Sequence, residues 1–90
     1  MFLLTKRVGE TLQNVGIDFT DRLLTSEGIS SGTVTCATSG IVSGAVATTT
    51  TLTADLAAGS DAGEYVIEYV ATGDLGSIME SQVLLCVLDI

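Results

Sequence analysis

The sequence predicts an all-β fold, an antiparallel β-sandwich, from its composition and its pattern of glycines. The chain has 90 residues, 47% of them hydrophobic, but its aromatic residues are only two Phe and two Tyr. The core must therefore be built from Val, Ile, Leu, Ala and Thr, and β-branched side chains fit a pleated sheet better than a helix. Proline is absent and ten glycines separate the apolar segments. A chain of this length supports one domain with a single core.

Residues 1–10 are predicted to form an extended N-terminal docking arm, and residues 11–90 a single β-sandwich domain. The arm begins with Phe2, Leu3 and Leu4, continues through Lys6 and Arg7, and shows no clear hydrophobic period. Chain ends of this kind are usually disordered unless another surface holds them. We therefore expect the arm to bind a neighbouring protein, and we expect the sandwich to fold without residues 1–8.

Three strands are predicted in the first half of the domain. A strand is expected at 11–18, followed by a single helical turn that Thr20 or Asp21 could cap. Residues 30–38 form the second predicted strand, with Val34 and Cys36 on one face. The third is predicted at 45–54 and includes four consecutive threonines at 48–51, because threonine is a strong β former.

Two longer strands complete the expected sandwich. After a turn at 57–63, residues 64–72 alternate, with Tyr65 and Ile67 on one face and Val66 and Glu68 on the other. A glycine-rich connection at 73–76 leads to the last strand at 77–89. Short strands separated by glycine turns at this spacing are typical of an immunoglobulin-like antiparallel sandwich.

The last strand is apolar on both faces over its second half. Its core-facing set is expected to be Met79, Ser81, Val83, Leu85 and Val87. The outer set then holds Glu80 and Gln82, but also Leu84, Cys86, Leu88 and Ile90. Because an exposed apolar strand invites aggregation, either the rest of the chain or a neighbouring subunit must cover it. The predicted partner-binding residues are accordingly Phe2, Leu3, Leu4, Lys6, Arg7, Leu84, Leu88 and Ile90.

The residue inventory argues against an enzyme. The chain has no His, which removes the usual general base and the commonest metal ligand. The carboxylate pairs Asp18 with Asp21 and Asp61 with Glu64 fall in predicted turns, where Asp is common for structural reasons. We expect no catalytic residue, cofactor or metal. The two cysteines, Cys36 and Cys86, could bridge the two sheets, or could remain reduced as small buried side chains, which we favour.

The charge balance excludes further classes of partner. Three Lys and Arg stand against eleven Asp and Glu, a formal net charge of −8. Nucleic acids and anionic membrane surfaces both require basic side chains, so neither is expected as a partner.

The longest apolar run, 83–88, is far shorter than the about 20 residues that span a bilayer. No secretory signal is recognised at the start. We expect a soluble product made in the cytoplasm.

Several short motifs resemble one family. Lys6-Arg7-Val8-Gly9-Glu10 and the segment at 17–23 are similar to the opening of small immunoglobulin-like virion proteins of tailed bacteriophages, a group that includes fibre–tail adaptors and head–tail accessory proteins. Gly63-Glu64-Tyr65-Val66, Val70-Ala71-Thr72-Gly73 and residues 82–87 match later motifs in the same order. Val8 stands where the family usually has proline, and Gly76-Ser77 where Gly-Arg is frequent.

The resemblance implies a virion structural protein, made in the host bacterial cytoplasm. Its expected role is an adaptor joining tail or head components, with a capsid decoration (cement) protein as the alternative. Implied partners are fibre, tail, portal or major capsid proteins and other copies of the chain in a symmetric assembly. A generic immunoglobulin-like binding module ranks lower, because its loops should display aromatic side chains and both tyrosines lie within a predicted strand.

Overall fold

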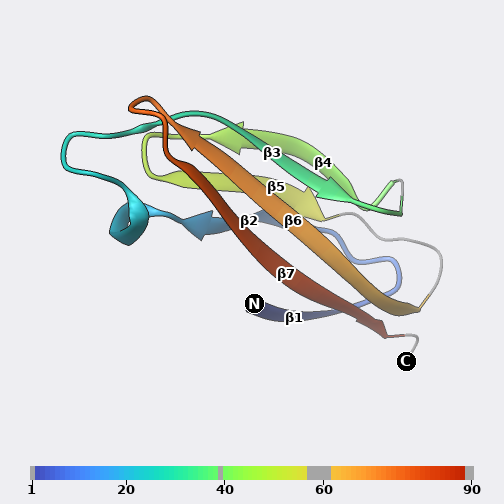
Figure 1. Cartoon of the computed structure of the whole chain (residues 1–90). Helices are drawn as coiled ribbons and strands as arrows, with labels where there is room; N and C mark the ends of the chain where they lie inside the picture. The colour runs from blue at the N-terminus through green and yellow to red at the C-terminus, as the bar shows by residue number, and fades with distance from the viewer. Residues whose placement is uncertain (1, 39, 57–61, 89–90) are drawn as a thin grey trace.

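The two sheets of a β-sandwich make up the fold (Figure 1). The structure, a computed structural model, describes residues 2–38, 40–56 and 62–88, with the side chain of Phe2 left aside. In this part of the chain lie seven strands and one 3₁₀ turn: β1 (Phe2–Arg7), β2 (Leu12–Asp18), η1 (Thr20–Arg22), β3 (Ile29–Cys36), β4 (Val42–Ala47), β5 (Thr51–Leu56), β6 (Gly63–Gly73) and β7 (Ile78–Leu88). The all-β prediction is confirmed.

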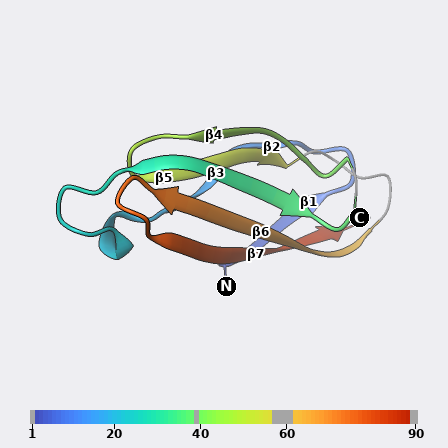
Figure 2. The same cartoon turned by 45° about the horizontal axis from the view of Figure 1, so that its top comes forward.

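The strands form a four-stranded sheet of order β1-β7-β6-β3 and a three-stranded sheet of order β2-β5-β4. Figure 2 shows the two sheets as stacked layers. All pairings are antiparallel except that of β1 with β7, which is parallel. The hairpin of β6 and β7, with 11 residues in each strand, is the longest element of the fold.

The core lies between the sheets and consists of aliphatic side chains around two aromatic ones. Phe19 and Tyr69 are fully buried. The Tyr69 hydroxyl crosses from β6 to donate a hydrogen bond to the Val15 carbonyl of β2, at 2.8 Å. This bond satisfies a buried hydroxyl and joins the two sheets. The sheets approach closely at Gly32, where a Cβ would lie 2.8 Å from Leu52 Cδ1, so a larger residue would have to displace that core side chain.

The predicted N-terminal arm is a strand of the sandwich. Residues Phe2–Arg7 pair in parallel with Val83–Leu88 of β7, and the Val8 N–H continues the ladder to the Leu88 carbonyl at 2.9 Å. The proposed boundary at residue 10 therefore does not separate an arm from a folded body. The segment was not recognised as a strand because its polar and apolar residues do not alternate, and the inward face that the structure shows includes a lysine.

The predicted strand at 45–54 was wrong, because the chain folds there into a hairpin of β4 and β5. Thr48, Thr49 and Thr50 form its turn, and Thr51 begins β5. The Thr48 hydroxyl accepts hydrogen bonds from the N–H groups of Thr50 and Thr51 at 3.4 and 3.0 Å. Hydroxyl-to-backbone bonds of this kind compete with the sheet ladder, and here they outweigh the β propensity of threonine.

The predicted helical turn is present as η1, but neither Thr20 nor Asp21 caps it. Asp18 holds its start, because its carboxylate accepts hydrogen bonds from the Thr20 N–H at 2.9 Å and from the Thr20 hydroxyl. The bond from the Thr20 hydroxyl, followed by that from the Thr20 N–H, lowers the pKa of Asp18.

Candidate docking surface

The described part of the chain has no pocket and no group of three or more His, Cys, Asp or Glu that could hold a metal ion. Asp18 is engaged at η1, and Asp61, from the other carboxylate pair considered above, lies outside the described residues. Within the same residues, no helix is long and apolar enough to cross a membrane.

The two cysteines are free and cannot bridge the sheets. Cys36 lies in β3 and Cys86 in β7, and β6 separates these two strands within one sheet. Cys36 packs against the core, whereas Cys86 is on the opposite face. A disulfide needs Cα atoms about 4.4–6.8 Å apart, which two strands that are not neighbours do not provide.

The outer face of the four-stranded sheet is the strongest candidate for a functional surface. Along β7 the predicted alternation is confirmed, since Met79, Val83, Leu85 and Val87 are buried. The other set faces outward, as expected. β1 does not cover this face; it lies beside β7 and extends the same face by one more strand. The rest of the described chain therefore leaves this face of β7 uncovered.

Strand register brings apolar side chains from three strands into one row. Leu3 of β1 pairs with Leu84 of β7, which pairs with Val66 of β6. Leu3 is 66% exposed and Val66 44% exposed, whereas Leu84 between them is half-buried. Cys86 and Leu88 continue the apolar surface along β7, and Leu88 is 39% exposed. We name these five residues the outer patch: Leu3, Val66, Leu84, Cys86 and Leu88.

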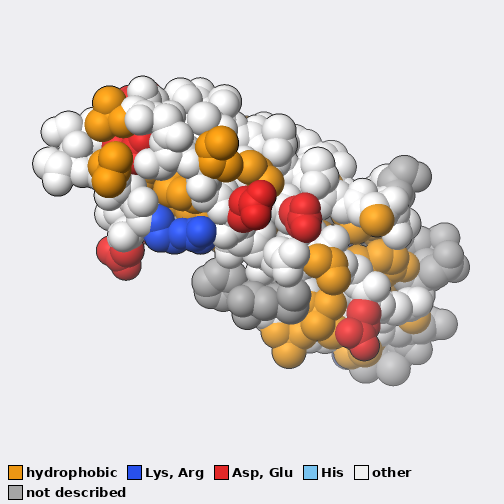
Figure 3. All heavy atoms as spheres, viewed as in Figure 1, with side chains coloured by type: hydrophobic (Ala, Val, Ile, Leu, Met, Phe, Trp, Pro, Cys, Tyr) orange, Lys and Arg blue, Asp and Glu red, His pale blue; other side chains and the backbone are white. Residues whose placement is uncertain are grey.

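Acidic side chains adjoin the outer patch. Glu64 pairs with Cys86, and Glu68 lies opposite Gln82, whose Nε2 donates to Glu68 Oε1 at 3.2 Å. Glu80 lies further along β7 on the same outer side. Figure 3 shows hydrophobic side chains gathered over β6 and β7, with acidic side chains among them. The face is thus apolar with negative charge around it.

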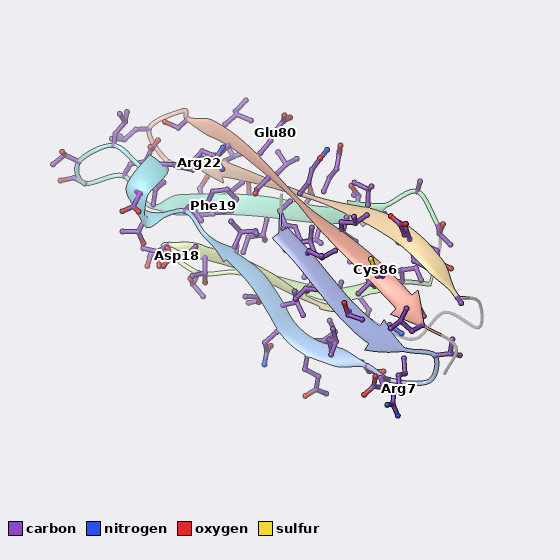
Figure 4. The ribbon with its side chains drawn as sticks, turned by 90° about the horizontal axis from the view of Figure 1, so that it is seen from below. Arg7, Asp18, Phe19, Arg22, Glu80 and Cys86 are labelled. Atoms are coloured by element: carbon purple, nitrogen blue, oxygen red, sulfur yellow. The ribbon has the colours of Figure 1, made fainter. Side chains whose placement is uncertain are left out.

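The two arginines lie far from each other (Figure 4). Arg7 is paired in register with Leu88, and Arg22 projects from η1. Figure 4 shows the two arginines at opposite ends of the molecule. Arg22 Nη2 donates to the Glu80 carbonyl at 2.8 Å, and its guanidinium lies 5.2 Å from the centre of the Phe19 ring, so this arginine fastens η1 to the start of β7.

The structure places some of the predicted partner-binding residues together on the outer face and at least one of them on the inward face. Leu3, Leu84 and Leu88 meet on the outer face, with the exposed Arg7 at its end. Ile90 and the side chain of Phe2 lie outside the described residues. Leu4 points inward and packs against the core.

Lys6 was wrongly predicted to be available to a partner. It is only 2% exposed, because it lies on the inward face of β1, two residues after Leu4. Its Nζ donates to the Arg7 carbonyl at 3.3 Å. A lysine can bury its long aliphatic stem in this way while its ammonium group finds a backbone acceptor.

Val66 of the outer patch was not among the predicted partner-binding residues. The sequence alternation correctly places it on one face with Glu68, but the pairing that aligns it with Leu84 and Leu3 joins residues far apart in the chain. A signal was present, since Val66 is a branched apolar residue on the same predicted face as Glu68.

Comparison with known proteins assigns no relative. No protein-family model matches the chain, and no curated protein shows significant similarity to it.

Proposed function

We propose that this chain is a non-enzymatic structural subunit of a tailed-bacteriophage virion, an adaptor that joins tail or head components and is held through the outer patch. The observation on which this rests is the row Leu3–Leu84–Val66, an apolar surface built by three strands and uncovered by the described chain. A protein normally covers such a surface with a partner. Virion membership comes from the sequence motifs, which resemble those of small phage structural proteins.

The strand order supports the immunoglobulin-like part of the proposal. In immunoglobulin domains the second, fifth and fourth strands share one sheet, and the third, sixth and seventh share the other. The orders β2-β5-β4 and β7-β6-β3 match this arrangement, but β1 lies beside β7, whereas the first strand of a constant-type immunoglobulin domain belongs to the other sheet. The motif at Gly63-Glu64-Tyr65-Val66 lies at the start of β6, where it places Val66 in the outer patch.

The acidic surroundings of the outer patch indicate the chemistry of its partner. Glu64, Glu68 and Glu80 lie on the same face, and the whole chain has a formal charge of −8. Electrostatic complementarity favours a partner protein whose apolar contact surface is bordered by Lys or Arg. Two copies meeting through this face would repel each other, so the patch serves a different protein.

Incorporation into particles tests the proposal. Purified virions of the phage that encodes the chain should contain it, and Val66→Lys should reduce its incorporation at least about tenfold, since a charge in an apolar contact costs more than 1.4 kcal/mol. Ile78→Lys is the matched control: Ile78 is 70% exposed at the far end of β7, outside the patch. Absence of the chain from virions, or equal incorporation of both variants, would overturn the proposal.

Copy number then separates the adaptor from the cement protein. A connector or fibre-attachment ring holds on the order of a dozen subunits, whereas a protein decorating a whole capsid is present in hundreds of copies, on the order of the major capsid protein. Quantitative mass spectrometry of purified virions, normalised to the major capsid protein, distinguishes the two. A ratio near one would replace the adaptor with the cement protein.

A further inference from the structure

The edge strand β1 is held to the sandwich mainly through one neighbour. It pairs with β7 alone, in the only parallel pairing among the described strands. Parallel pairs are slightly less stable per residue than antiparallel ones, and terminal segments open at low free energy. The connection to β2 passes Gly9, whose φ is +92° and where an added Cβ would meet nothing within 4 Å. The connection is a short turn, closed by the bond from the Glu10 N–H to the Arg7 carbonyl at 3.2 Å. Opening the turn at Gly9 breaks this local bond but no bond of the β1–β7 ladder.

The edge of β7 nonetheless requires this strand. β1 places Leu4 and Lys6 on the core side, in register with Leu85 and Val87. Leu85 is fully buried and Val87 is 2% exposed. Removing β1 would leave the backbone N–H and C=O groups along one side of β7 unpaired and would open this end of the core.

We propose that β1 is exchanged between copies of the chain, so that Phe2–Arg7 of one copy pairs with β7 of a second. An exchanged strand makes the same ladder hydrogen bonds and the same core contacts as the chain's own strand, so exchange loses only the local bonds of the turn before β2. The occupant is a second copy because the inward side chains, Leu4 and the buried Lys6, already match this edge. Exchange at the β7 edge joins two copies without requiring contact between the acidic outer faces, which would repel each other.

The register allows a disulfide to record which copy's β7 the strand β1 occupies. Thr5 of β1 lies beside Cys86 of β7, and both face outward. Neighbouring strands are about 4.8 Å apart, within the Cα separation that a disulfide accepts. Thr5→Cys in a Cys36→Ser background can therefore link β1 to whichever β7 it occupies. Trypsin cuts after Lys6 and Arg22, so position 5 and Cys86 are recovered on different peptides.

The experiment uses full-length chains of two isotopic compositions. Unlabelled and ¹⁵N-labelled Thr5→Cys/Cys36→Ser proteins are mixed in equal amounts, unfolded, refolded together, oxidised and mapped by mass spectrometry without reduction. Complete exchange gives about half of the linked peptide pairs one labelled and one unlabelled member. Linked pairs that are all of one isotopic kind would show that β1 stays on its own chain, and would overturn the proposal.

Two further sets of substitutions provide a control for collision and a second pair of cysteine positions. Thr33→Cys with Cys36→Ser measures cross-linking by collision, because Thr33 is exposed on β3, in the same sheet but not beside β7; mixed pairs must exceed its level. If Thr5→Cys fails to fold, Leu3→Cys with Leu84→Cys in a Cys36→Ser/Cys86→Ser background tests the same register. Val66→Lys should leave the exchange unchanged, so this inference and the proposed function can fail separately.

Discussion

Glu27 ties a loop to a hairpin that lies far from it in the chain. Its carboxylate accepts hydrogen bonds from the Leu24 N–H at 3.1 Å and from the Leu75 and Ser77 N–H groups, each at 3.2 Å. A Cβ at Gly73 would collide with this carboxylate, so the close approach requires glycine there. The loop between η1 and β3 is thereby fixed to the turn between β6 and β7.

These bonds predict a pH-dependent contribution to stability. The Leu24 N–H lowers the pKa of Glu27 most, and Ser77 and Leu75 lower it further against the opposing effect of burial. A carboxylate with a lowered folded-state pKa stabilises the fold fully above its ordinary pKa, about 4.3, and loses that contribution as the pH falls through the folded-state value. Glu27→Gln should therefore lower Tm at pH 7, and its difference from the parent protein should shrink as the pH drops below about 4.3.

Thermal unfolding from pH 7 to 3, followed by circular dichroism, measures this difference. Glu68→Gln is the matched control, because Glu68 is exposed and its bond to Gln82 is a surface contact. A gap between Glu27→Gln and the parent that stays constant to pH 3 would contradict the assigned role of the ionised carboxylate.

At the scale of elements, β1 separates its two leucines by face. Leu4 packs against the core, whereas Leu3 is 66% exposed. Both belong to the same strand and have the same side chain, so they form a matched pair for asking whether the segment is a strand of the sandwich or a free arm.

Leu4→Ala should destabilise the fold by about 1–3 kcal/mol, less than a fully buried leucine because Leu4 is half-buried. Leu3→Ala should change stability by no more than about 0.5 kcal/mol, as is usual for exposed positions. Urea unfolding at constant m-value measures both. Equal and negligible effects would show that residues 2–7 do not pack on the core in solution. For the same reason, we now expect deletion of residues 1–8 to weaken the sandwich.

At the scale of the whole molecule, negative charge opposes association through exposed apolar surface. The formal charge is −8 at pH 7, while the isoelectric point is about 4.1. The mean hydropathy of +0.57 is high, and the outer patch leaves part of that apolar surface in contact with solvent. Charge repulsion keeps such molecules apart until the net charge falls toward zero.

We expect self-association to rise steeply as the pH approaches about 4 and to depend on the outer patch. Light scattering should show less association for the double variant Val66→Thr/Leu84→Thr than for Ile78→Thr, which removes an exposed apolar residue outside the patch. Circular dichroism at each pH separates association of folded protein from acid unfolding. Equal light scattering from the two variants would show that self-association does not depend on the outer patch.

Local pattern was sufficient for much of this architecture. The all-β class followed from composition and the pattern of glycines, and the turn at η1 from residues that could cap it. The two faces of β6 and the inward and outward sets of β7 followed from side-chain alternation, because a period of two residues is a property of the strand itself. Two members of the outer patch on β7, Leu84 and Leu88, were predicted from the same alternation. No property of distant residues was needed.

Tertiary pairing decided the rest. Which strand lies beside β7, whether Lys6 is buried, and whether Val66 joins Leu84 depend on contacts between residues separated by up to most of the chain. The split of 45–54 into β4 and β5 depended on a turn whose hydroxyl bonds compete with pairing. Alternation along a strand states which side chains share a face, but the neighbouring strand that completes the face is chosen only when the whole sheet is assembled.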